Sequence, residues 1–151
     1  MPQAIPDGYH SLTPYLTFKD AAQAVEFYKA ALGAVVLYQL TMPGGKIAHG
    51  ELRIGDSRLM FADAMPEWGN KSAKDYGGTP VGLNLFTENV DALAERFVKA
   101  GGKRVRPLEN QFYGDRSGQF EDPEGYKWTL AQHVEDVSPE EMQRRMEKLS
   151  G

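Results

Sequence analysis

The sequence predicts an α+β fold: two βαβββ modules form a curved, eight-stranded mixed sheet around a cavity, and a C-terminal helix follows. The first observation is an internal repeat, since a strand, a polar cap, an amphipathic helix and a glycine occur twice, about 68 residues apart, in FKDAAQAVEFYKAALG and FTENVDALAERFVKAGG. One such module cannot bury its sheet alone, so two should combine. The second observation is that three strands joined by short turns follow each helix, and such strands cannot be parallel.

A chain of 151 residues fits one domain, spanning 1–151. The polar, glycine-rich stretch DAMPEWGNKSAKDYGGT predicts a linker and surface loop with one helical turn. The expected parts are module one over 9–63, the linker over 64–79, module two over 80–134 and the C-terminal helix over 138–149.

In module one, Pro14 lacks a backbone donor, so the first strand should be short or lie at an edge. Asp20 suits the N-cap of a helix over 21–32, which Gly33 ends. The first strand is expected over 9–18 with three apolar side chains on one side, Leu12, Leu16 and Phe18. The other strands of the module are expected over 35–40, 47–54 and 58–62.

Module two repeats this order. Its elements are expected as a strand over 81–86, a helix over 89–100 and strands near 103–108, 111–121 and 126–134. Alternation in the last strand predicts that Trp128 and Leu130 face the core while Thr129 faces the cavity. Before it, Asp115 and Arg116 stand beside a glycine, which is typical either of a turn held by an Asp–Arg pair or of the polar wall of a pocket.

In the tail, Ser138 suits an N-cap and Pro139 the first helical position. An apolar stripe on this helix predicts a docking face against the body or a partner subunit, and it consists of Met142, Met146 and Leu149.

The second module and the tail carry three motifs, F-Y-G-D-R-x-G, D-P-x-G-Y-x-W and H-x-E-D-V-S-P-E-E-M. Together they closely resemble the PhnB-like branch of the vicinal-oxygen-chelate superfamily, which includes glyoxalases, bleomycin-resistance proteins and extradiol dioxygenases. The resemblance covers nearly the whole chain and implies a concave ligand cavity. Metal-dependent members hold a divalent ion with four side chains, and these positions fall here on Thr13, Met60 (or Phe61 if the register slips), Gly82 and Thr129. Because none is a histidine or a carboxylate, we expect no metal there and no cofactor.

A displaced site is an alternative, because His49, Glu51 and Arg53 alternate along one strand and share a face. His49 and Glu51 could bind a metal or form an acid–base pair with His133. The competing interpretation makes His49 a surface residue and Glu51–Arg53 a solvated ion pair. There is no cysteine, which removes thiol nucleophiles and disulfides.

Two functions remain open. The first is a non-catalytic binder of a small organic molecule, with Arg116 holding Asp115, Glu51 or a ligand carboxylate or phosphonate. The second is an enzyme of lyase, isomerase or dioxygenase type that uses His49, Glu51 or His133 as acid, base or nonstandard metal ligand. The expected pocket is lined by Thr13, Tyr15, His49, Glu51, Met60, Asn84, Tyr113, Arg116 and Thr129.

Net charge is −4 and the basic residues are scattered, so nucleic acid is not expected as a partner. No apolar run approaches the length of a membrane span, and the N-terminal MPQAIPDGYH has no features of a signal peptide. We therefore expect a cytoplasmic homodimer that binds a small molecule and does not associate with membranes.

Overall fold

The computed structural model describes residues 2–150, so the two ends of the predicted domain, residues 1 and 151, lie outside the described residues. It confirms the α+β fold class, with two βαβββ modules and a C-terminal helix. Module one consists of β1 (Tyr15–Phe18), α1 (Ala21–Leu32), β2 (Val35–Thr41), β3 (Ile47–Ile54) and β4 (Ser57–Asp63). A short 3-10 helix (Pro66–Trp68) follows, and then module two with β5 (Gly82–Phe86), α2 (Val90–Lys99), β6 (Lys103–Asn110), β7 (Asp115–Glu121) and β8 (Lys127–His133). The last helix is α3 (Pro139–Ser150).

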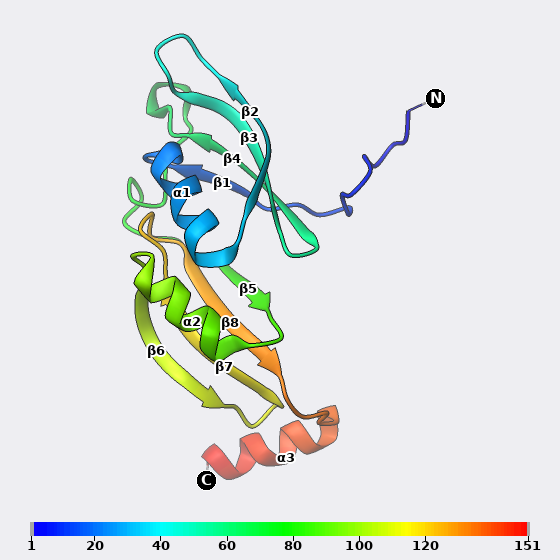
Figure 1. The fold of residues 1–151 in the computed structure, drawn as a ribbon. Coiled ribbons are helices and arrows are strands. Elements are labelled where there is room, and N and C mark those ends of the chain that lie inside the picture. Colours follow the sequence, from blue (N-terminus) through cyan, green and yellow to red (C-terminus); the bar gives the residue numbers. More distant parts are fainter. Residues whose placement is uncertain (1, 151) are drawn as a thin grey trace.

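The eight strands lie in two four-stranded sheets, of order β1-β4-β3-β2 and β5-β8-β7-β6, rather than in one continuous sheet (Figure 1). In each sheet the first strand of the module pairs in parallel with the fourth and the other pairs are antiparallel. At β1, the Tyr126 hydroxyl from module two donates to the Thr17 carbonyl at 2.9 Å and accepts from the Thr17 amide at 3.1 Å. These bonds satisfy the backbone groups of Thr17 and link the modules at this edge.

Two strands begin several residues after their predicted starts. The first begins at Tyr15 rather than at residue 9, since the ladder to β4 stops where Pro14 interrupts the donors, and Leu12 is 88% exposed rather than aligned with Leu16. The strand expected over 111–121 begins at Asp115, because a turn closes between Gln111 and Asp115.

The helix starts show the repeat at atomic detail. Asp20 accepts from the Gln23 amide and Asn89 from the Ala92 amide, as N-cap side chains do. In addition, Asp63 at the end of β4 accepts from the first amide of α1, and Gln132 in β8 accepts from the first amide of α2. Each module therefore fixes its helix to its own last strand in the same way.

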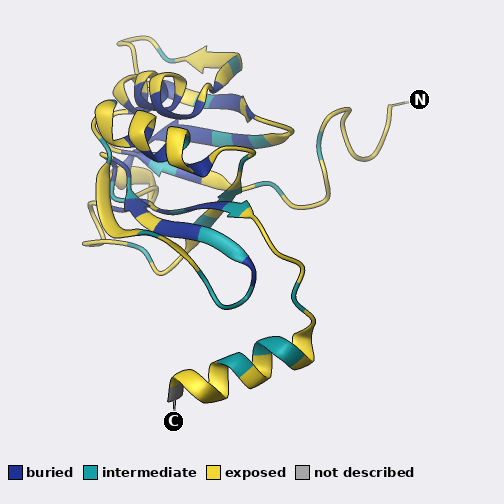
Figure 2. Ribbon diagram, turned by 60° about the horizontal axis from the view of Figure 1, so that its bottom comes forward, coloured by how far each residue is buried: buried dark blue, intermediate teal, exposed yellow. Residues whose placement is uncertain are grey.

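One face of each sheet is buried beneath the helices, and the opposite face is open. Phe18, Leu52 and Phe61 are fully buried against α1 in the first module. The two helices pack together, with Phe27 and Phe97 in edge-to-face contact at 5.1 Å between ring centroids. Trp128 and Leu130 are buried as predicted, 4% and 0% exposed. Figure 2 shows this division between a buried centre and exposed outer surfaces.

A buried carboxylate, Asp122, joins the modules in the core. Its Oδ1 atom accepts from the amides of Glu124 and Tyr126, each at 2.9 Å. Its Oδ2 atom accepts from the Trp128 indole at 2.9 Å and from the Tyr28 hydroxyl of α1. Burial raises the pKa of Asp122, and these hydrogen bonds oppose the shift.

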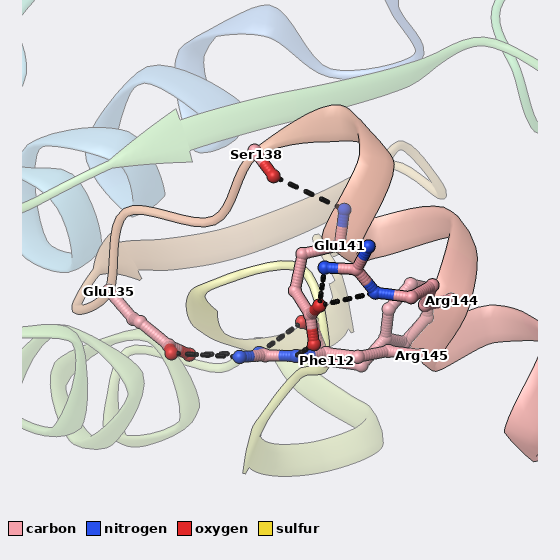
Figure 3. A network of polar contacts seen from close by, with 6 residues as sticks. All are labelled: Phe112, Glu135, Ser138, Glu141, Arg144 and Arg145. Carbon is pink, nitrogen blue, oxygen red and sulfur yellow. Dashed lines mark hydrogen bonds and ion pairs between the residues drawn. The ribbon is translucent and has the colours of Figure 1, made fainter.

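Helix α3 extends beyond the second sheet and is mostly exposed (Figure 2). Ser138 caps it as predicted, accepting from the Glu141 amide at 3.2 Å. Arg145 ties it to the body by donating to the Phe112 carbonyl at 2.8 Å and to Glu135 at 3.0 Å (Figure 3). On the predicted stripe, Leu149 is 70% exposed. Within residues 2–150, no helix is long and apolar enough to cross a membrane.

Candidate functional site

A row of side chains crosses the open face of the first sheet. Tyr15 in β1 stands opposite Met60 in β4, Met60 opposite Glu51 in β3, and Glu51 opposite Tyr38 in β2. His49 lies two residues from Glu51 and so projects from the same face. Four of the predicted pocket residues, Tyr15, His49, Glu51 and Met60, are thus brought together.

Hydrogen bonds connect the polar members of this row, which we call the relay cluster (Tyr15, Tyr38, His49 and Glu51). The Tyr15 hydroxyl contacts His49 Nδ1 at 2.9 Å, and His49 Nε2 contacts Glu51 Oε2 at 2.8 Å. The Tyr38 hydroxyl donates to the same Glu51 oxygen at 2.6 Å. The expected solvated Glu51–Arg53 pair is therefore wrong, because Glu51 is buried, 6% exposed, and its partners are His49 and Tyr38.

Two hydrogen-bond arrangements fit these contacts. With an ionised Glu51, which only accepts hydrogen bonds, His49 donates from Nε2; a neutral imidazole then accepts at Nδ1 from the Tyr15 hydroxyl, whereas a charged one donates to it. Burial, and next the neighbouring Tyr38, raise the pKa of the Tyr15 phenol, which favours the protonated donor. The cluster can accordingly present a half-exposed phenol backed by an imidazole and a buried carboxylate.

Tyr38 was absent from the predicted pocket, and a backbone irregularity explains why. Val36 stands opposite Leu52, whose side chain is in the core, and strict alternation would put Tyr38 on the same buried side. A register shift between Val36 and Tyr38 instead places Tyr38 opposite Glu51 on the open face. Nothing in the composition of the strand indicates where that shift occurs.

The other predicted residues lie on the second sheet. Asn84 stands opposite Thr129, as Tyr15 stands opposite Met60, so Met60 and Thr129 occupy equivalent positions in the two modules. Asn84, Thr129 and Tyr113 line a cavity of about 560 Å³ on this sheet. The Tyr113 hydroxyl lies 3.3 Å from Ser117 Oγ, another residue of the wall. Thr13 lies elsewhere, in a cavity between the modules that Asn84 also lines.

Arg116 does not pair with Asp115 or Glu51, so these two of its three suggested partners are wrong. Its guanidinium binds Asp91 of α2 through two nitrogens, at 3.0 and 2.9 Å. The reason is alternation: Arg116 shares the helix-covered side of β7 with Phe120, which packs against Phe97 of α2. The hydrogen bond from Arg116 lowers the pKa of Asp91.

His133 also has partners other than those suggested. Its ring nitrogens contact Asp115 at 2.8 Å and Asp136 at 2.7 Å, on an exposed end of β8, so the suggested acid–base pair with His49 is wrong. Hydrogen bonds to Asp115 first, and then to Asp136, raise the pKa of His133.

The residues at the four family metal positions do not fit a divalent ion. Thr13 and Thr129 offer hydroxyls, Met60 a thioether and Gly82 no side chain, whereas such ions need imidazole or carboxylate ligands. Within residues 2–150, no group of three or more His, Asp, Glu or Cys side chains is arranged to hold a metal. The expected lack of a metal stays a prediction that rests on the chemistry of these donors.

Two relatives are similar in sequence to most of this chain. An uncharacterized protein of Mycobacterium bovis is 41% identical over 139 residues, covering 90% of this chain and 91% of the relative. The protein YjdN of Escherichia coli is 28% identical over 142 residues, covering 79% of this chain and 92% of the relative.

Solved structures agree with the fold. A gene product of Arabidopsis thaliana is 26% identical with a TM-score of 0.66, covering 82% of this chain and 98% of that chain. A PhnB protein of Bacillus cereus shows the same fold at 16% identity with a TM-score of 0.63, covering 82% of this chain and 99% of that chain. Residues 10–130 match the model of one family. The chain belongs to the Glyoxalase/Bleomycin resistance protein/Dioxygenase superfamily, as its C-terminal motifs indicated.

Proposed function

We propose that this protein binds a small organic molecule on the open face of its first sheet, and that it does so without a metal at the four family positions. The relay cluster carries the proposal. The buried Glu51 carboxylate holds the His49 imidazole and the Tyr38 phenol, and His49 in turn contacts the Tyr15 phenol. Both phenols are half-exposed, Tyr15 at 50% and Tyr38 at 46%. Preorganised polar groups beside aromatic surface suit a ligand with both polar and apolar parts.

The proposed ligand is organic and has an apolar surface, because the same face also exposes apolar groups. Leu40 stands opposite His49 in the ladder and is 56% exposed. Met60 lies between Tyr15 and Glu51 in the row and is partly buried. A planar or aliphatic portion of a ligand could contact these side chains while its polar groups reach the phenols.

A homodimer in the cytoplasm is part of the same proposal. Exposed apolar side chains on α3, Met146 at 48% and Leu149 at 70%, support a docking surface for a second copy. Sedimentation tests it: dilute protein should sediment as a dimer, and a species of 16.8 kDa would contradict this part of the proposal.

The binding test begins with protein dialysed against a chelator and a thermal-shift screen of small organic molecules. A ligand at a hundred times its Kd should stabilise the fold by about 2.7 kcal/mol. Each hit is then titrated against wild type, Tyr15→Phe and His49→Ala, with His133→Ala as the matched histidine control. A loss of affinity of about tenfold or more in His49→Ala, corresponding to about 1.4 kcal/mol, would support the proposal if the affinity of His133→Ala is unchanged. Equal affinities of all four proteins for every hit would overturn the proposal.

An acid–base enzyme is the second candidate, and the chain Tyr15–His49–Glu51 favours it. A phenol backed by an imidazole that a buried carboxylate orients is a geometry able to hold and transfer a proton at the Tyr15 oxygen. To test this, each screening hit is incubated in D₂O with wild type and, separately, with Glu51→Gln. Its C–H signals and any products are followed by NMR. Exchange or turnover with wild type alone supports an enzyme. A hit recovered unchanged from both leaves binding as the function.

A further inference from the structure

A second cavity, of about 200 Å³, lies between the two modules, and no residue of the relay cluster lines it. The segment at residues 8–14, the β3–β4 hairpin, β5 and Trp128 form its walls. Much of the lining is apolar, with Leu12, Leu83 and Trp128 among its residues. Pockets for drug-sized ligands usually measure about 300–1,000 Å³, so this one suits a smaller molecule.

Arg58 brings a positive charge to the wall of this cavity. Its side chain is partly buried, and within residues 2–150 no carboxylate forms an ion pair with it. Arg58 also stands directly opposite Arg53 in the β3–β4 ladder, where like charges disfavour the pairing. A fully buried guanidinium is normally paired, and an anion from solution would supply a partner to this partly buried one.

The residues before β1 hold this guanidinium in place. Arg58 lies over the Tyr9 ring, 4.7 Å from its centroid. Gly8 allows the approach, since a β-carbon there would lie 2.1 Å from a terminal nitrogen of Arg58. Within residues 2–150, the buried Tyr9 hydroxyl has no hydrogen-bond partner, although buried hydroxyls usually have one. Both residues line the cavity, so one ligand could serve both groups.

From these observations we propose that the cavity between the modules binds a small amphipathic anion, a carboxylate with a short apolar body. The carboxylate pairs with the Arg58 guanidinium and accepts from the Tyr9 hydroxyl, while the apolar body contacts Leu12, Leu83 and Trp128. This site is separate from the one proposed above, and either can fail without the other.

The test uses hexanoate as the probe and Trp128 as the reporter. The chain has two tryptophans, and Trp68→Phe removes the exposed one, so that the remaining indole fluorescence comes from the cavity wall. Added hexanoate should change the Trp128 fluorescence, and the change should saturate as the hexanoate concentration rises. Hexanol and hexylammonium, which keep the apolar body, and inorganic phosphate, which lacks it, should bind at least about tenfold more weakly.

Variants made in the Trp68→Phe protein test where the carboxylate of hexanoate binds. Arg58→Gln should lower the affinity for hexanoate by about tenfold or more. Two controls should keep it within about twofold of the unmutated site: Arg104→Gln, which makes an equal charge change on the second sheet, and His49→Ala. Tyr9→Phe should weaken hexanoate without lowering the melting temperature of the free protein, because its hydroxyl has no partner to lose. Circular dichroism checks that each variant is folded. If Arg58→Gln does not fold, Arg58→Lys takes its place and should weaken hexanoate severalfold. Absence of saturation, equal binding of hexanol, or equal losses in Arg58 and Arg104 variants would overturn the proposal.

Discussion

Replacing Asp122 by alanine should destabilise the protein more than any surface change, because its carboxylate joins the two modules. The substitution leaves the Tyr28 hydroxyl and the Trp128 indole without their acceptor, and these residues are 1% and 4% exposed. A buried donor left without a partner costs about 1–3 kcal/mol, so the two together should cost about 2–6 kcal/mol. The amides of Glu124 and Tyr126 lose the same acceptor and add to this.

Urea unfolding followed by circular dichroism measures the free energy of unfolding. Asp56→Ala, in the exposed turn of the other module, is the matched control and should stay within about 0.5 kcal/mol of wild type. A double-mutant cycle with Tyr28→Phe adds a sharper check. Tyr28→Phe should cost stability in wild type but little in Asp122→Ala, where the hydroxyl is already unpaired. A loss below about 1 kcal/mol in Asp122→Ala, or additive effects in the cycle, would refute the reasoning.

Three further predictions follow from particular contacts. Gly50→Ala should cost about 1–3 kcal/mol in urea unfolding, because its β-carbon would lie 2.2 Å from the buried Phe61 ring, whereas Gly82→Ala, with open space around it, should cost much less. The pKa of His133 is raised in the folded protein, so the stability advantage of wild type over His133→Gln should be present below pH 6.5 and fade as pH rises through the folded pKa. Melting temperatures at several pH values check this, and a gap that grows with pH would contradict it. Arg116→Lys should leave the affinity for any screening hit unchanged, because the guanidinium is bound to Asp91. A clear loss of affinity in titration would contradict this and show that Arg116 contacts the ligand.

The sequence predicted those features that depend on local chemistry. Asp20, Ser138 and the terminal glycines defined helix ends to within a residue or two, and the alternation around Trp128 gave the correct buried face. The internal repeat predicted two modules. It could not predict that the strands would form two sheets, because the link at β1 is made by a side chain, Tyr126, about 109 residues away in the chain.

The candidate site was predicted only in part, for the same physical reason. His49 and Glu51 were placed on one face by their spacing, and that placement is confirmed by their hydrogen bond. Tyr38 was missed because a register shift, not the residue pattern, turns it to that face. The partner of Arg116 was also missed, since Asp91 lies on α2, a helix that tertiary contacts such as the packing of Phe97 against Phe120 bring near.

The most direct test of metal-free binding at the relay cluster is a calorimetric titration of the strongest screening hit. The titration is done before and after removal of divalent ions by a chelator, and again with zinc, nickel or manganese added back. Because Thr13, Met60, Gly82 and Thr129 lack metal-binding side chains and the relay cluster is held by its own hydrogen bonds, the affinity should be the same in all three conditions. It should fall by about tenfold or more in His49→Ala. Binding that disappears with the chelator and returns with a divalent ion would contradict the account.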